Sequence, residues 1–218
     1  APILLTNSLT LTSETADEIE RLGAQMVYIL GGSGAISADI EDTLSADYTV
    51  ERIEGSNRYE TSANIARFLD ENEKLQTNQA VIAYARNFPD ALAVSSWAAQ
   101  NGVPILLSET DYLPAATDEI LSELEISDTI ITGGNSVISA QVESDLPNPT
   151  RYGGNNRYET AVEIITGLGQ DTDTIFVATG ENFPDALAGS ALAAKQGKSI
   201  LLIGGTINDS ISAFLNDK

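Results

Sequence analysis

Strand-length hydrophobic runs alternate along this chain with longer segments whose apolar residues recur at helical spacing. Residues 80–84 form a continuous apolar run, Ala-Val-Ile-Ala-Tyr, which is typical of a strand buried on both faces of a sheet. Further strand-length runs lie at 3–5, 104–107, 129–132, 174–178 and 200–202. Strands that alternate with helices pair in parallel through right-handed crossovers. The pattern therefore predicts an α/β protein with Rossmann-like layers, in which helices cover both faces of parallel sheets.

Capping residues and apolar stripes predict the helices between these strands. Residues 57–60 and 156–159 both have the form N-x-x-E, in which Asn caps a helix start and Glu reaches back to it. Behind the first of these boxes an apolar stripe at helical spacing continues to about Leu69. A helix is predicted at 90–100, where Asn87 with Asp90 repeats the capping pattern and Pro89 suits the first turn. Further helices are predicted at 114–124 and, with Ser139 as cap, at 141–146.

One seven-residue motif occurs twice. Residues 87–93 and 182–188 both read N-F-P-D-A-L-A, and each copy follows a predicted strand and opens a helix rich in small residues. The two helices are predicted to end near Gly102 and Gly197. The repeated unit is therefore strand, tight loop and helix, and we expect the rest of the chain to be organised around it.

Other matching segments set the repeat length at about 100 residues. The segment ERIEGSNRYET at 51–61 returns as TRYGGNNRYET at 150–160. One complete repeat spans 50–149, residues 1–49 match the second half of a repeat, and residues 150–218 match the first half. The chain thus holds about two repeats. We predict that the two partial segments combine into one unit, although a tandem arrangement of half-units is the alternative.

Glycine pairs follow three of the strands, at 31–32, 133–134 and 204–205. A loop of this kind can hold phosphate, but none of the three has the G-x-G-x-x-G or G-x-x-x-x-G-K-[ST] spacing. We interpret the pairs as tight turns that need a positive φ.

Composition excludes several classes of function. The chain of 218 residues contains no histidine and no cysteine, which excludes Ser-His-Asp and Cys-His catalysis and thiolate metal sites. We therefore expect no catalytic residue, no metal site and no cofactor. The net charge of -21 should repel nucleic acid, and no apolar run approaches the length of a membrane span. Weak binding of divalent cations by surface carboxylates is a further interpretation of this charge.

The repeated motifs supply the candidate site residues. Asp90 and Asp185 are either carboxylates of a site or, as we favour, residues that stabilise a helix start. Arg58 and Arg157 either bind an anion or hold a neighbouring loop. Tyr59 and Tyr158 are expected to pack at the edge of the core, and Trp97 varies to Leu192 as a packing difference.

With these residues in hand, the chain resembles the type-2 cell-wall-binding repeat of bacterial and some archaeal surface proteins. The family pattern R-x-x-G-x-x-R-Y-x-T-A matches residues 151–161 throughout and residues 52–62 up to Ser62. Its G-x-N-F-P-D-A-L-A loop is matched from Gly180, whereas the copy before Asn87 lacks the glycine. The P-I-L-L strand and the G-G-x-x-A-I-S segment are present as well.

This resemblance implies a non-catalytic module at the cell wall or cell surface that anchors an exported protein by binding a cell-wall glycan or an anionic secondary wall polymer. It implies tandem Rossmann-like or Toprim-like units, usually three to a protein. Two alternatives are a self-assembling surface-layer module that binds no glycan and, less favoured, a nucleotide or sugar enzyme with Rossmann-like layers. An oligomer or neighbouring repeats are further expected partners.

Loops at the carboxyl ends of parallel strands form a crevice into which helix N-termini point. We therefore expect a repeated binding crevice there. Its predicted residues are Arg58, Asn87, Asp90, Arg157, Asn182 and Asp185.

Overall fold

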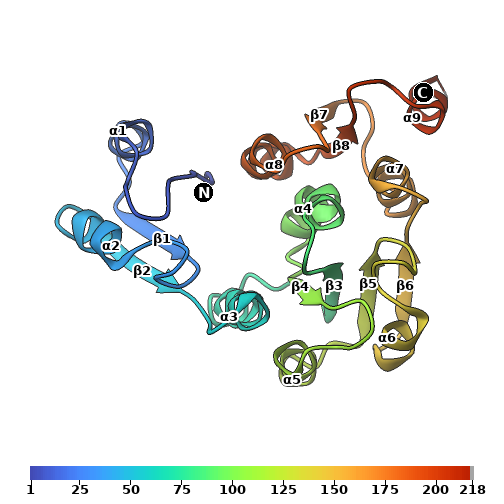
Figure 1. Ribbon diagram of the computed structural model, residues 1–218, viewed down its shortest axis with the longest axis horizontal. Coiled ribbons are helices and arrows are strands. Elements are labelled where there is room, and N and C mark those ends of the chain that lie inside the picture. The colour runs from blue at the N-terminus through green and yellow to red at the C-terminus, as the bar shows by residue number, and fades with distance from the viewer. Residues whose placement is uncertain (217–218) are drawn as a thin grey trace.

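The structure is a computed structural model that describes residues 1–216 (Figure 1). Helices and strands alternate along the whole chain. The strands are β1 Met26–Leu30, β2 Thr49–Ile53, β3 Gln79–Tyr84, β4 Ile105–Ser108, β5 Asp128–Thr132, β6 Pro149–Tyr152, β7 Ile175–Thr179 and β8 Ser199–Ile203. The helices are α1 Ser13–Arg21, α2 Ala38–Ser45, α3 Arg58–Glu71, α4 Pro89–Asn101, α5 Ala115–Glu123, α6 Ala140–Asp145, α7 Arg157–Gly167, α8 Pro184–Gln196 and α9 Asp209–Asn216. Every paired strand runs parallel to its neighbour, so the predicted α/β class is confirmed.

The middle of the chain forms a four-stranded sheet in the order β4-β3-β5-β6. Ile82 of β3 lies opposite Leu106 of β4 on one side and Ile131 of β5 on the other, and all three side chains are fully buried. A strand covered on both faces needs an unbroken apolar sequence, which residues 80–84 of β3 have.

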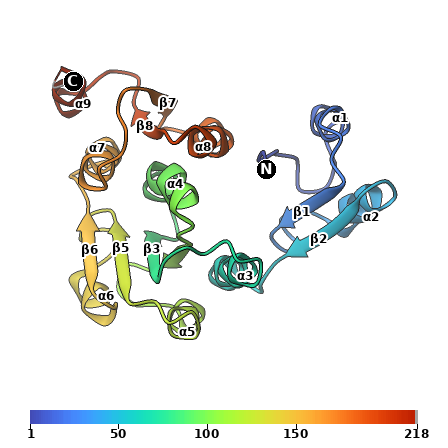
Figure 2. The same cartoon turned by 180° about the vertical axis from the view of Figure 1, so that it is seen from behind.

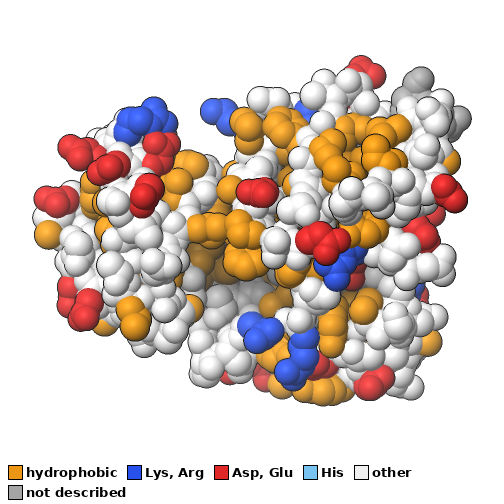
Figure 3. All heavy atoms as spheres, turned by 45° about the horizontal axis from the view of Figure 1, so that its top comes forward, with side chains coloured by type: hydrophobic (Ala, Val, Ile, Leu, Met, Phe, Trp, Pro, Cys, Tyr) orange, Lys and Arg blue, Asp and Glu red, His pale blue; other side chains and the backbone are white. Residues whose placement is uncertain are grey.

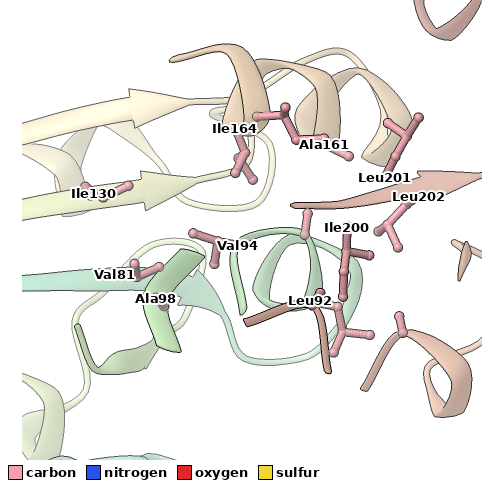
Figure 4. Close-up of a cluster of buried hydrophobic side chains, with 14 of the residues drawn as sticks. Val81, Leu92, Val94, Ala98, Ile130, Ala161, Ile164, Ile200, Leu201 and Leu202 are labelled. Carbon is pink, nitrogen blue, oxygen red and sulfur yellow. The ribbon is translucent and has the colours of Figure 1, made fainter. Parts of the chain in front are cut away.

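Two hydrophobic clusters cover the two faces of this sheet. Helices α3, α5 and α6 pack over the face that carries Ile82 and Ile131. Val81 and Ile130 point to the other face, where they meet α4. Figure 4 shows α4 lying between those two residues and strand β8, so this second cluster continues into the C-terminal repeat. The middle sheet and the C-terminal repeat therefore share one core.

The helix starts agree with the sequence at Asn57, Asn156 and Ser139 and differ at Asn87. Asn57 and Asn156 each accept hydrogen bonds from two backbone N–H groups of the following turn, as predicted. Asn87 is not the cap of α4: Phe88 holds that position, and the Asn87 side chain accepts only from the Phe88 N–H, at 3.0 Å. This helix start has a local cause, because Pro89 is the first helical residue and lacks the N–H that an Asn87 cap would bond.

The two ends of the chain form smaller sheets of two strands each, β1-β2 and β7-β8. Both views show the N-terminal unit standing beside α3 and apart from β7 and β8 (Figures 1 and 2). The sheet boundaries fall after Ile53 and Tyr152, because β2 pairs with β1 and β6 pairs with β5. The union of the two terminal segments into one unit stays a prediction.

The N-terminal strand expected at residues 3–5 does not form, and this expectation was wrong. Its counterpart β4 is hydrogen-bonded to β3, but within residues 1–216 the N-terminal sheet holds only β1 and β2. Without a neighbour of the β3 type, Leu4 and Leu5 are left exposed.

The free sheet edges carry large apolar side chains. Val177 of β7 is 57% exposed, whereas its counterpart Ile82 in the complete sheet is fully buried. On β1, Tyr28 is exposed while its counterpart Ile130 is buried. Figure 3 shows hydrophobic side chains gathered in the hollow between the N-terminal unit and the rest of the molecule. Both terminal sheets therefore expose apolar surface that the complete sheet covers.

Candidate functional site

The two copies of the N-F-P-D motif meet where α4 and α8 pack against each other. The rings of Phe88 and Phe183 contact edge to face with centroids 6.0 Å apart. The guanidinium of Arg157 lies over the Phe88 ring, 5.7 Å from its centroid. Residues that sit at equivalent places in two repeats are thus brought to a single boundary between those repeats.

Both candidate arginines hold the carbonyl at the end of a neighbouring strand. The Nη1 atom of Arg58 donates to the carbonyl oxygen of Ala85 at 2.7 Å, just after β3. Arg157 makes the same bond to Gly180, just after β7, at 2.5 Å. This repeated bond gives both arginines a structural role, and their contact with a ligand stays a prediction.

The two motif aspartates lie in different surroundings. Asp90 and Asp185 both occupy the first turn of their helix, as expected. Asp90 is partly buried against Gly133, and burial raises its pKa to about 6 while the charge of Arg157 acts in the opposite direction. Asp185 is exposed, as are Asn87 and Asn182. The predicted crevice residues therefore differ in exposure: Asn87, Asn182 and Asp185 are exposed, whereas Asp90 is partly buried.

Each motif tyrosine donates its hydroxyl to a carboxylate that the sequence did not reveal. Tyr59 donates to Glu109, which is only 7% exposed, and Tyr158 donates to Glu181 at 2.5 Å. Arg86 also binds Glu109, with its Nε 2.9 Å from both carboxylate oxygens. Hydrogen bonds from Arg86 and then from Tyr59 lower the pKa of Glu109, so its charge is stable near neutral pH.

A pocket lies at the start of α7, between the second glycine pair and the loop after β6. Its volume is about 620 Å³, and it is lined by Gly134, Asn135, Ser136, Gly153, Gly154, Asn155, Glu159, Val162, Glu163 and Ser210. A second pocket of about 520 Å³ lies at the start of α3 and is lined by Gly32, Ser33, Gly34, Glu54, Gly55, Ser56 and Glu60. All seven lining residues of the second pocket have their repeat counterparts in the first.

The chemistry of the pockets is that of hydroxyl recognition. Glu60 accepts from the backbone N–H of Ser56 at 2.8 Å, and Glu159 accepts from that of Asn155 at 3.0 Å. Hydrogen bonds from these residues hold the pKa of both carboxyls below its usual range. Charged carboxylates beside backbone amides and small polar side chains can both accept from and donate to a polyol.

The glycine before each capping box is required by close packing. A Cβ on Gly55 would come within 2.3 Å of the Glu60 Cβ, and one on Gly154 would approach Glu159 equally closely. The R-x-x-G segment therefore has its glycine because the loop lies directly against the first turn of the helix. The sequence contained this signal, but it gave no indication that a pocket lies beside it.

Two further observations concern residues 1–216 as a whole. No group of three or more Asp and Glu side chains in this part of the chain is arranged to hold a metal ion. Every helix in the same range is too short or too polar to cross a bilayer.

The fold and its repeated pockets define a repeat-built α/β module with its polar sites at the starts of equivalent helices. The chain belongs to the family of cell wall binding domain 2 (CWB2), whose model matches residues 1–41, 52–143 and 151–218. The resemblance inferred from the motifs is thereby confirmed.

Two relatives from Bacillus subtilis (strain 168) are similar over nearly the whole chain. The chain is 38% identical to the N-acetylmuramoyl-L-alanine amidase LytC over 206 residues, which cover 94% of this chain and 40% of that protein. It is 35% identical to the amidase enhancer, covering 93% of this chain and 28% of that protein. The chain thus spans less than half the length of either relative.

Solved structures have the same fold. Cwp6 from Clostridium difficile matches 99% of this chain with a TM-score of 0.87 and 29% identity, over 35% of its own length. Cwp8 from the same organism matches 98% of this chain with a TM-score of 0.84 and 28% identity, over 38% of its length.

Proposed function

We propose that this chain is a non-catalytic module that binds a glycan or secondary polymer of the cell wall and thereby anchors an exported protein at the cell surface. The observation that carries the proposal is the recurrence of one polar pocket at the same place in two repeats. A polymer presents the same chemical unit many times, and a repeated pocket is suited to such a ligand.

The size and lining of the pockets favour sugar units. Both volumes fall within the range of about 300–1,000 Å³ that is usual for small-molecule sites. Because Glu60 and Glu159 remain charged there, a hydroxyl-rich group is favoured over a bare phosphate, which the carboxylates would repel. Each site alone is shallow and polar, so we expect weak binding at one pocket and useful retention from several.

An enzymatic function is less favoured for this chain. LytC is an N-acetylmuramoyl-L-alanine amidase, but this chain matches only 40% of its length. Catalysis usually needs an asymmetric arrangement of groups, whereas these pockets are near copies of each other. The chain also lacks histidine, the commonest general base.

A pull-down with purified Bacillus subtilis walls tests the proposal. Ser33→Trp and Asn135→Trp place a bulky ring in equivalent pockets at exposed loop positions, and Ser122→Trp on the exposed face of α5 is the matched control. We expect each pocket variant to retain part of the binding and the double variant to lose most of it. A folded double variant that binds like the parent would refute the pocket assignment, and a parent that binds no walls would refute wall binding.

A further inference from the structure

The carboxylate that each motif tyrosine needs comes from a different place in the two repeats. Tyr59 bonds to Glu109, which follows β4, whereas Tyr158 bonds to Glu181, which follows β7. The counterpart of Glu181 in the middle repeat is Arg86, since both directly precede the Asn of an N-F-P-D motif. The middle repeat has therefore gained a cation at the position where the other repeat keeps its carboxylate.

This exchange changes the charge around the two tyrosines. In the middle repeat Arg58 and Arg86 stand beside Glu109, and both guanidiniums help to hold its pKa below the usual range. In the C-terminal repeat Glu181 accepts from Tyr158, and Arg157 also lies close enough to that tyrosine to lower the pKa of its hydroxyl. The group around Tyr59 therefore has two cations and one carboxylate. The group around Tyr158 has one cation and one carboxylate. A local excess of positive charge is notable in a chain with a net charge of -21.

The arginine of this group faces solvent although its partner is buried. The side chain of Arg86 is 62% exposed, whereas that of Glu109 is 9% exposed, and Nη2 of Arg86 lies 2.7 Å from the Glu109 carboxylate. Glu109 thus holds the guanidinium from beneath and leaves its outer side open to water. A guanidinium fixed in this way loses less side-chain entropy when it binds an anion.

An exposed aromatic ring completes the group. Tyr112 is 58% exposed and lies close enough to Tyr59 to help raise the pKa of the Tyr59 hydroxyl, after burial and Glu109. It is held there by its loop, in which the hydroxyl of Ser108 donates to the backbone carbonyl of Glu109 at 3.0 Å. The counterpart of Tyr112 in the C-terminal repeat is Ile207, which has no aromatic face. The exposed ring, three residues after Glu109, offers a surface for a sugar ring, while the guanidiniums near Glu109 can bind its charge.

We propose that Arg86, Arg58 and Tyr112 form an anion-selective subsite of the middle repeat, which binds an acidic saccharide unit through the guanidiniums while the tyrosine covers the sugar ring. The subsite rests on the proposed function and refines it. It assigns the polymer's negative group to the middle repeat, while the pockets hold neutral parts. Arg58 and the pocket residue Glu60 both belong to the first turn of α3, so the proposed subsite and the pocket are near the same helix start.

The test compares Bacillus subtilis walls before and after acid extraction of their anionic polymers. Arg86→Gln removes the positive charge. Arg86→Lys keeps the charge but lacks the planar guanidinium with its paired donors. Tyr112→Ala removes an exposed ring. Glu181→Gln is the matched control in the other repeat. Thermal unfolding of each variant shows whether it is folded.

We expect the parent to bind intact walls at least tenfold more tightly than extracted walls, because a charge-assisted hydrogen bond contributes about 1.5–3 kcal/mol. Arg86→Gln should lose that preference, Arg86→Lys should keep part of it, and Tyr112→Ala should bind both walls less well. Folded Arg86→Gln and Tyr112→Ala variants that match the parent on both walls would overturn the subsite and leave the pockets standing. Equal binding of the parent to both walls would overturn its anion selectivity, and no binding to either would overturn the proposed function as well.

Discussion

The carboxylate of Asp90 lies so close to Gly133 that a Cβ at that glycine would come within 2.7 Å of Oδ2. Asp90 belongs to the first turn of α4 and Gly133 to the turn after β5, so this contact joins two strand ends of one sheet. Gly133 has a φ of 106°, which only glycine adopts readily. The glycine pair after β5 therefore both makes the turn and leaves room for the motif aspartate.

Stability should depend on pH through Asp90. Its folded pKa of about 6 lies above the ordinary value of 3.8, so between these values the folded state keeps a proton that the unfolded state has lost. Stability from this group therefore falls as pH rises through the window of about 4 to 6. Asp90→Asn should gain about 1–3 kcal/mol relative to the parent between pH 4 and pH 7, measured by urea unfolding.

Asp185→Asn is the matched control for this effect. Asp185 occupies the same place in its helix but is exposed, so its substitution should give no such gain over the same pH range. Equal behaviour of the two variants would show that burial beside Gly133 does not set the pKa of Asp90.

Loss of a helix cap should distinguish residues that look alike in the sequence. Asn57→Ala and Asn156→Ala each remove a side chain that accepts two backbone N–H groups, and each should cost about 1 kcal/mol. Asn87→Ala removes only a contact with the neighbouring Phe88 N–H and should cost less than half of that. Urea unfolding of the three variants measures the difference, and a cost for Asn87→Ala as large as the other two would contradict the assigned helix start.

The helix caps and strands could be predicted because they depend on neighbouring residues. The N-x-x-E boxes needed only four positions, and the apolar run at 80–84 marked a central strand by itself. Asn87 was misassigned because Pro89 shifts the helix start, and the strand at 3–5 was wrong because a strand also needs a partner.

The candidate site was harder to predict because its contacts join distant positions. Tyr59 and Glu109 are 50 residues apart, and the equivalent acceptor for Tyr158 comes from another loop. No repeated spacing connects a tyrosine to its carboxylate in both repeats. The pockets were hidden for a similar reason, since each is formed by two loops that are far apart in sequence.

The glycine of the R-x-x-G segment should tolerate no side chain. Gly55→Ala would bring a Cβ within 2.3 Å of Glu60, so loop and helix must separate, and overpacking of this kind costs about 1–3 kcal/mol. Gly34 lines the same pocket, but a Cβ added there would have no atom within 4 Å, so Gly34→Ala is the control. For Gly55→Ala, the midpoint of thermal unfolding should be well below that of Gly34→Ala. Equal midpoints would refute the close-packing explanation.

Energetic coupling between the two motif loops should be measurable through their phenylalanines. Phe88 and Phe183 meet edge to face, and such pairs contribute about 0.5–1.5 kcal/mol beyond the area that they bury. Phe88→Ala should cost more than Phe183→Ala, because Phe88 is only partly exposed, packs against the shared core and also carries Arg157 over its ring. Removing either ring deletes the pair, so the double variant should lose less than the sum of the two single losses.

A double-mutant cycle in urea measures this coupling. Phe68, whose ring contacts Tyr28 instead, supplies the control cycle with Phe183, and that cycle should be additive within about 0.5 kcal/mol. If the Phe88–Phe183 cycle is equally additive, the two loops touch without stabilising the boundary, and the shared core alone would have to hold the two repeats together. A clear coupling would instead show that the motif, which occurs once in each repeat, serves to join them, because each copy supplies one ring of the pair.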